Sequence, residues 1–151
     1  MTSRLAVCGV LLAGFGALAA FTSSATPQGY TPVVPCVVPA GTTVTLAYPV
    51  PGATGVPDAL SQVVVAVSSP LPATWKIVLG AAGNGYGEAL LTAIAPNAIP
   101  TPYAAPTSTP ISYESSIVSG SLPVGSLVGV LLADTSSTCN AYPQIGTFST
   151  Q

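Results

Sequence analysis

The chain has 151 residues, a formal net charge of −2 and a hydrophobic content of 49%, and only 4% of its residues are charged, against about 25% in an average soluble protein. This length suits one ordinary domain with a short extension, and the high apolar content with low net charge excludes intrinsic disorder. The two basic residues in the whole chain are too few for nucleic-acid binding or for recruitment to anionic lipid.

The first 25 residues resemble an export signal in composition. Arg4 precedes a largely apolar run over residues 5–21, and a Ser-Ser-Ala motif ends at Ala25, the order of a signal peptide and its cleavage site. We expect cleavage after Ala25, with Ala19 as an alternative position. An uncleaved anchor is the second interpretation, because the run is at the lower length limit of a membrane-spanning helix. The protein is therefore expected to be secreted, periplasmic or on the cell surface, and to be free of the membrane once the signal is cleaved.

Two cysteines remain after the signal peptide. Cys8 lies near the start of the apolar run, and most of the run follows it instead of preceding it, so we do not expect lipid attachment there. Cys36 and Cys139 form an even pair in an oxidising compartment, which predicts a single disulfide. Such a bond would close a loop of about 100 residues and stabilise the fold by roughly 4.7 kcal/mol in the chain-entropy description. With no histidine in the chain, a zinc site is not expected.

A proline-rich stretch separates the signal peptide from the remaining chain. Residues 26–40 contain Pro27, Pro32, Pro35 and Pro39 among threonines and valines, which predicts an extended, polyproline-like stalk that does not fold alone. After removal of residues 1–25, the chain keeps one lysine and four acidic residues, which gives a formal net charge of −3. We therefore divide the chain into a signal peptide (1–25), a stalk (26–40) and one domain (41–151).

The first half of the domain contains three segments of alternating apolar residues, at residues 43–48, 62–68 and 75–79. Alternation with a period of two predicts β-strands that are covered on at least one face. The apolar positions are Val44, Leu46 and Tyr48, then Val63, Val65 and Val67, then Trp75, Ile77 and Leu79. We expect Trp75 in the core, because Ile77 and Leu79 share its face.

Glycines dominate residues 80–87, where Asn84-Gly85 predicts a tight hairpin turn. A phosphate-binding loop is the alternative, but the pattern matches neither nucleotide fingerprint. Residues 88–95 combine helix-favouring Glu, Ala and Leu with the length and position of a strand, and we expect a strand.

The second half begins with residues 96–110, which contain five prolines and are expected to form a long surface loop or an irregular edge. Three more strands are expected at residues 111–119, 126–133 and 145–150. The total of about seven strands, with no convincing helix, predicts an all-β, immunoglobulin-like Greek-key β-sandwich.

Two groups of segments resemble bacterial immunoglobulin-like and fibronectin type III-like domains. The first is the PGATGVP turn at residues 51–57, followed by the valine strand at 63–67 and the SPLP corner at 69–72. The second is residues 122–130 together with 146–150, which look like the last two strands of such modules. The resemblance implies that Cys36, just before the first strand, and Cys139, in the last loop, are neighbours, and that their disulfide attaches the stalk to the domain.

A non-catalytic function is expected from the same residues. Without histidine, neither a Ser-His-Asp nor a Cys-His mechanism can operate in this chain alone, and no cofactor is expected. The leading hypothesis is an exported structural, interaction or adhesive module with an unidentified protein or glycan partner. The alternative is a small carbohydrate-binding domain that uses exposed loop aromatics. Tyr103 and Tyr86, in the proline-rich loop and at the hairpin, are the candidate partner-binding residues.

Overall fold

The computed structural model describes residues 31–81, 83–86, 89–107 and 111–151, and residues Pro32–Gln151 form one compact unit. The predicted signal peptide and residues 26–30 of the predicted stalk lie outside the described residues. In the described part of the chain there is no α-helix, only one short 3₁₀ helix, η1 (Pro96–Ala98). No helix in these ranges is long and apolar enough to cross a membrane.

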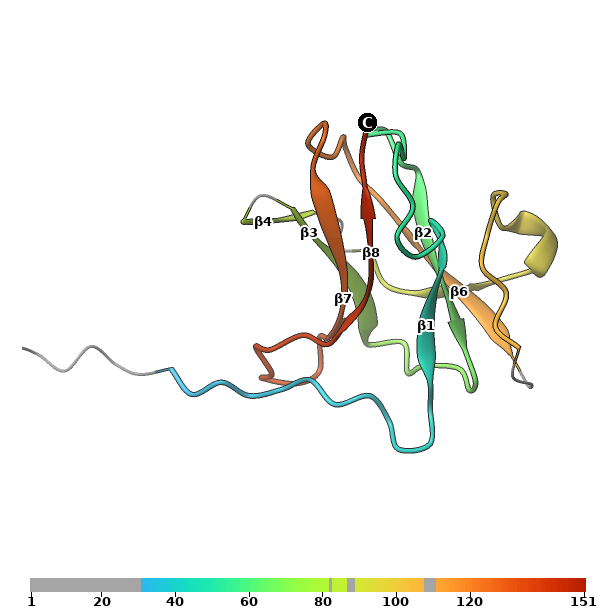
Figure 1. The fold of residues 1–151 in the computed structure, drawn as a ribbon. Coiled ribbons are helices and arrows are strands. Elements are labelled where there is room, and N and C mark those ends of the chain that lie inside the picture. Colours follow the sequence, from blue (N-terminus) through green and yellow to red (C-terminus); the bar gives the residue numbers. More distant parts are fainter. Residues whose placement is uncertain (1–30, 82, 87–88, 108–110) are drawn as a thin grey trace, which may run out of the picture. The chain divides into compact units, whose positions relative to one another are not determined.

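Eight strands form two antiparallel sheets (Figure 1). The strands are β1 (Val44–Tyr48), β2 (Gln62–Val67), β3 (Trp75–Ala81), β4 (Asn84–Tyr86), β5 (Thr92–Ile94), β6 (Ser112–Ile117), β7 (Leu127–Asp134) and β8 (Gln144–Ser149). One sheet has the order β1-β2-β6-β5 and the other the order β4-β3-β7-β8. The predicted all-β sandwich is confirmed, with the short β4 added to the seven expected strands. The strand order is also that of immunoglobulin-type sandwiches, in which strands A, B, E and D face C, F and G.

The core lies between the two sheets and is built from the alternating positions of the central strands. Val63, Val65 and Val67 of β2 face inward, opposite the inward residues of β3 and β7. Trp75 is 3% exposed and belongs to this cluster, as expected. Each strand contributes every second side chain to this space. The inward side chains of the two sheets therefore fill it without a helix.

The sheet that contains β2 is also covered on its outer face. Val64 and Ala66 point away from the main core, yet both are buried in a second apolar cluster with Ala47 and Ile99. Ile99 belongs to the proline-rich segment that was expected to cross the surface, and Ala104 N–H in the same segment donates to Ala47 O (2.9 Å). The whole Val63–Val67 run is therefore buried on both faces.

The segments before and after β1 pair with the chain next to the two ends of β8, and so close one side of the sandwich. Pro35 forms a parallel bridge with Ala141 before β8, and Val56 forms one with Thr150 after it. Between these bridges the chain crosses to the other sheet as β1. The two sheets approach closely there, because a Cβ added at Gly146 of β8 would lie only 2.8 Å from Leu46 Cδ2. Only glycine fits at this position without movement of Leu46.

The predicted hairpin is present, but its turn is not at Asn84-Gly85. Ala81 pairs with Asn84 and Gly80 with Gly85, so both residues predicted for the turn are in β4. The connection lies two residues earlier and includes Gly83, with φ of +80°. Glycine adopts this left-handed conformation without the steric cost that a side chain would add, and Gly83 therefore serves better than the Asn-Gly pair.

Candidate functional site

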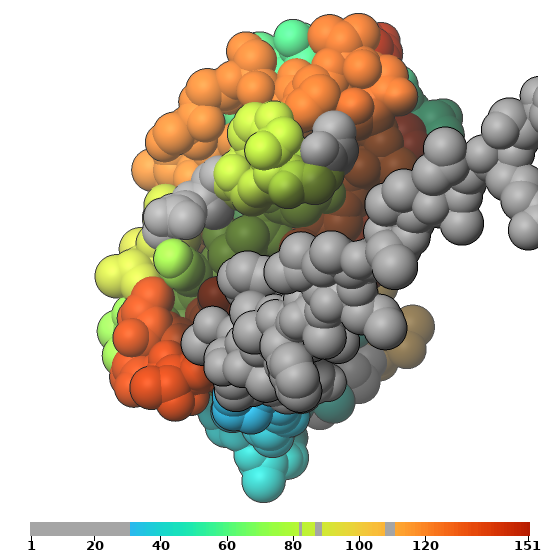
Figure 2. All heavy atoms as spheres, turned by 90° about the vertical axis from the view of Figure 1, so that its left-hand side faces the viewer, coloured from blue at the N-terminus to red at the C-terminus, as the bar shows by residue number. Residues whose placement is uncertain are grey.

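Three segments meet at the end of the sandwich where β2 and β7 finish. They are the N-terminal segment (residues 32–43), the β2–β3 loop (68–74) and the β7–β8 loop (135–143), called here the braced end. Figure 2 shows the β7–β8 loop in red-orange and the N-terminal segment in blue at this end, with the β6–β7 loop in orange at the other. In antibody variable domains the loops after strands B and F, here after β2 and β7, contribute to the binding surface.

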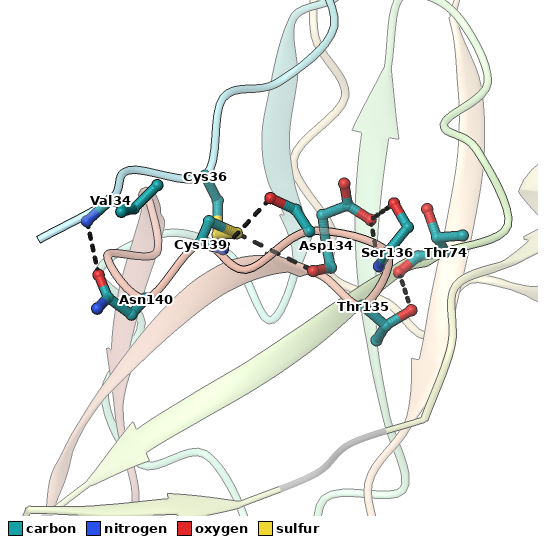
Figure 3. The surroundings of a disulfide bond; sticks show 9 residues. Val34, Cys36, Thr74, Asp134, Thr135, Ser136, Cys139 and Asn140 are labelled. Carbon is teal, nitrogen blue, oxygen red and sulfur yellow. Dashed lines mark hydrogen bonds between the residues drawn. A yellow bond between two sulfur atoms is a disulfide. The ribbon is translucent and has the colours of Figure 1, made fainter. Parts of the chain in front are cut away.

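A disulfide between Cys36 and Cys139 links two of these segments (Figure 3). The two Cα atoms are 5.0 Å apart, and the bond spans a sequence separation of 103 residues. Both cysteines are buried, at 6% and 8% exposure. The predicted pairing is therefore present, at the place that the resemblance implied.

Asn140 holds the N-terminal segment beside the disulfide. Val34 N–H donates to Asn140 Oδ1 (2.7 Å), and Asn140 Nδ2 donates to Pro32 O (3.0 Å). Backbone bonds continue the pairing, because Cys36 N–H donates to Ala141 O and the amides of Asn140 and Ala141 both donate to Val34 O. Residues 32–36 of the predicted stalk thus lie along the β7–β8 loop.

The β2–β3 loop is fixed to its surroundings by hydrogen bonds at three points, the first of which joins Ser68 to Thr43 of the N-terminal segment. Thr135 donates to Thr74 O through both its backbone amide (2.9 Å) and its hydroxyl (2.8 Å). Leu71 N–H donates to Oε1 of Glu114 on β6 (2.9 Å). Glu114 is 5% exposed, and burial raises the pKa of its carboxyl while the Leu71 hydrogen bond acts in the opposite direction.

Asp134 shapes the start of the β7–β8 loop. Its Oδ1 accepts hydrogen bonds from the backbone amide (3.0 Å) and the hydroxyl (2.8 Å) of Ser136. These bonds, with a further contribution from Thr74, lower the pKa of the Asp134 carboxyl. No group of three or more His, Cys, Asp or Glu side chains that could hold a metal ion occurs among the described residues.

The surface of the braced end is uncharged and includes exposed apolar side chains beside the polar residues of the β7–β8 loop. Val33 and Val37 are 72% and 75% exposed, and Tyr142 is 40% exposed. Residues 31–57 and 135–151 contain no charged side chain. Sequence reasoning missed Asn140 and the burial of Glu114. The available clue to Asn140 was its position directly after the disulfide cysteine. Its side-chain amide can both donate and accept hydrogen bonds.

The two candidate partner-binding tyrosines are not brought together. Tyr86, at the end of β4, is half-buried and packs on the main core between the sheets. Tyr103 is half-buried in the cluster outside the other sheet, with its ring edge-on to Tyr113 at a centroid distance of 6.0 Å. Both rings are used in packing and are less exposed than expected, and they do not form a common platform for a sugar.

A separate cavity of about 360 Å³ lies where the chain leaves β1. Its volume is within the range of small-molecule sites. Three hydroxyl groups are the only polar side-chain groups in its lining, which consists of Tyr48, Pro49, Val50, Ala53, Thr54, Gly55, Val56, Pro57, Thr101 and Pro102. It offers no carboxylate, amine or thiol for acid–base or nucleophilic chemistry.

Comparisons with protein-family models, with curated proteins and with solved structures found no match for this chain. The braced end therefore has to be interpreted from its own geometry. It combines a buried disulfide, an asparagine clamp, two fixed loops and an uncharged surface with exposed valines.

Proposed function

We propose that this protein is an exported, non-catalytic interaction module of the bacterial immunoglobulin-like type, which presents its braced end to a partner. The observation that carries the proposal is the Cys36–Cys139 disulfide, which holds exposed valines of the N-terminal segment in a fixed position beside the β7–β8 loop. A surface that is ordered before binding loses less conformational entropy when it binds.

Export is supported by the same bond. Protein disulfides persist mainly in oxidising compartments outside the cytosol, and the apolar segment that follows Arg4 has the order of an export signal. Intact-mass measurement of the exported product, before and after reduction, tests this part of the proposal. We expect loss of residues 1–25 and a gain of two hydrogen atoms on reduction. An unprocessed product with free thiols would count against export as a folded, oxidised protein.

The interaction function can be tested by photo-cross-linking in the cells that export the protein. A photoreactive amino acid replaces either Ala73 or Thr138, which are exposed in the β2–β3 and β7–β8 loops, or Val124, which is 70% exposed at the opposite end. We expect discrete cross-linked products from the first two positions and few from Val124. Equal yields from all three positions, or no products at all, would remove the support for the braced end as the binding surface.

A further inference from the structure

The Asn84-Gly85 pair lies exposed on the edge strand β4. Both residues are exposed, and β4 has only three residues, which pair on one side with β3 (Figure 1). No other strand of the described residues pairs with its second side. Asparagine is one of the thermolabile residue types, because its side-chain carboxamide lies close to the next backbone nitrogen of the chain. The exposed pair therefore indicates a chemically reactive position.

Strand register places the backbone nitrogen of Gly85 on the open side of β4. Ala81 and Asn84 are the last pair before the connection of the hairpin, and a pair with this spacing exchanges the hydrogen bonds that close the turn. In an antiparallel ladder such pairs alternate with pairs that exchange none. Gly80 and Gly85 form the next pair, so the N–H of Gly85 points away from β3. The ladder therefore leaves this nitrogen without a bond to β3.

The other two asparagines of the chain differ at the corresponding nitrogen. Asn97 and Asn140 are each followed by alanine. The nitrogen that follows Asn97 donates to Ala95 O (2.9 Å), and the nitrogen that follows Asn140 donates to Val34 O (3.0 Å). All three asparagines are in the described part of the chain, and Asn84 alone is followed by a nitrogen that points away from its neighbouring strand.

The glycine after Asn84 removes a steric barrier to reaction. It has no Cβ to crowd the approach of its nitrogen to the carboxamide, and its backbone is conformationally permissive. A three-residue edge strand with one neighbour also opens locally at low free-energy cost. Such opening lets the backbone of Asn84 rotate and brings the Gly85 nitrogen to the side-chain carbon, where the two groups react within one chain.

We propose that Asn84 is a site of spontaneous covalent modification in the folded protein, where solvent water converts it to aspartate and isoaspartate. The Gly85 nitrogen gives up its proton and bonds to Cγ of Asn84. The bond from Cγ to the side-chain nitrogen breaks, and this nitrogen leaves with the proton as ammonia. Water then opens the resulting five-membered imide at either carbonyl carbon. Opening at Cγ gives aspartate, and opening at the main-chain carbonyl gives isoaspartate.

The two products change the hairpin to different degrees. Both add a negative charge to a chain whose formal net charge is −2. Isoaspartate also adds one carbon to the main chain between residues 84 and 85, and this breaks the register of β4 with β3. Tyr86, which pairs with Leu79 and packs on the main core, then loses its fixed position. The modification therefore loosens this hairpin as the protein ages, and it requires no partner.

Peptide mapping of the folded, oxidised protein after incubation in water enriched in heavy oxygen tests the proposal. A protease that cuts after aromatic residues separates the three asparagines, because Tyr86 and Tyr103 lie between them. We expect the Asn84 peptide to appear as aspartate and isoaspartate forms that each carry one heavy oxygen atom. The Asn97 and Asn140 peptides should react at least about tenfold more slowly, because hydrogen bonds hold the attacking nitrogens away from the reactive geometry.

Gly85→Ala is the matched variant. A Cβ added at Gly85 would lie 3.6 Å from Val78 Cγ1, an ordinary contact, so the hairpin accommodates it. Conversion of Asn84 should slow by about tenfold or more, because the added Cβ crowds the attacking nitrogen. Asn84→Gln should abolish the reaction at this position, since its longer side chain cannot close a five-membered ring. Trp75 fluorescence confirms that each variant is folded.

Several results would overturn the modification site. They are an Asn84 peptide that stays unmodified in the folded wild type, equal rates at all three asparagines, and an unchanged rate in Gly85→Ala. Conversion that occurs in urea and not in the folded protein would overturn it as well, because the strand would then protect Asn84.

Discussion

Glu114 is a carboxylate on the core-facing side of β6. It lies in register with Val65, which is in the main core, and its side chain therefore points to the same face. Its carboxylate accepts a hydrogen bond from the backbone amide of Leu71 in the β2–β3 loop. This single carboxylate joins a central strand to the braced end, so its protonation state affects both.

The raised pKa of Glu114 has a definite consequence for stability. A carboxyl whose pKa is higher in the folded state binds its proton more tightly there. Its contribution to stability is therefore complete when the pH is below its pKa in the unfolded chain. That contribution is lost as the pH rises through its pKa in the folded protein. Glu114→Gln should therefore raise the free energy of unfolding near neutral pH, because the amide can keep the Leu71 hydrogen bond without a buried charge. The gain should vanish in acid, where the wild-type carboxyl is protonated. Urea unfolding at several pH values measures it.

Asp134→Asn is the control for this experiment, because the pKa of Asp134 is lowered instead of raised. A group with a lowered pKa stabilises the fold above its unfolded pKa and loses that contribution in acid. The Asn variant should therefore show no gain near neutral pH. A Glu114→Gln protein that is less stable than the wild type at neutral pH would show that the charged form is the one the fold prefers.

Among the elements, the N-terminal segment depends most on the disulfide. Replacing both Cys36 and Cys139 by serine should lower the free energy of unfolding by about 2–5 kcal/mol, because the bond restricts a long loop of the unfolded chain. Urea titration followed by Trp75 fluorescence measures the change, since the single tryptophan is buried in the core.

Asn140→Ala separates the clamp from the disulfide. It removes two hydrogen bonds at the surface, each worth about 1 kcal/mol or less in net stability, and it leaves the covalent link intact. Its effect on global unfolding should be clearly smaller than that of the serine pair. Equal effects would mean that the clamp, and not the cross-link, carries the stability of this segment.

Most strands could be predicted from the sequence, because apolar residues that alternate with a period of two lie on one face only if the segment is a β-strand. The valine run of β2 and the tryptophan-led run of β3 begin at the predicted residues. The hairpin turn was misplaced because two turn-forming sequences lie side by side, and only strand register decides between Gly83 and Asn84-Gly85. The clamp at Asn140 depends on pairing between segments about 100 residues apart, which local patterns do not encode.

At the scale of the molecule, the scarcity of charge is the dominant property. Asp58, Lys76, Glu114 and Asp134 are the charged residues among those the structure describes. Any partner of the braced end therefore has to be recognised chiefly by apolar contact and by neutral hydrogen bonds, because the segments that form this end carry no charged side chain.

The outer cover of β2 carries one more implication. The QVVVAV run of this strand is uncharged and lacks proline and glycine, a composition that favours cross-β fibrils when such a segment is laid bare. Ile99 and the chain that follows it lie over this run. A protease cut that releases this cover would therefore expose the apolar outer face of β2, and fibril growth would additionally require β2 to separate from β1 and β6, with which both of its edges are paired.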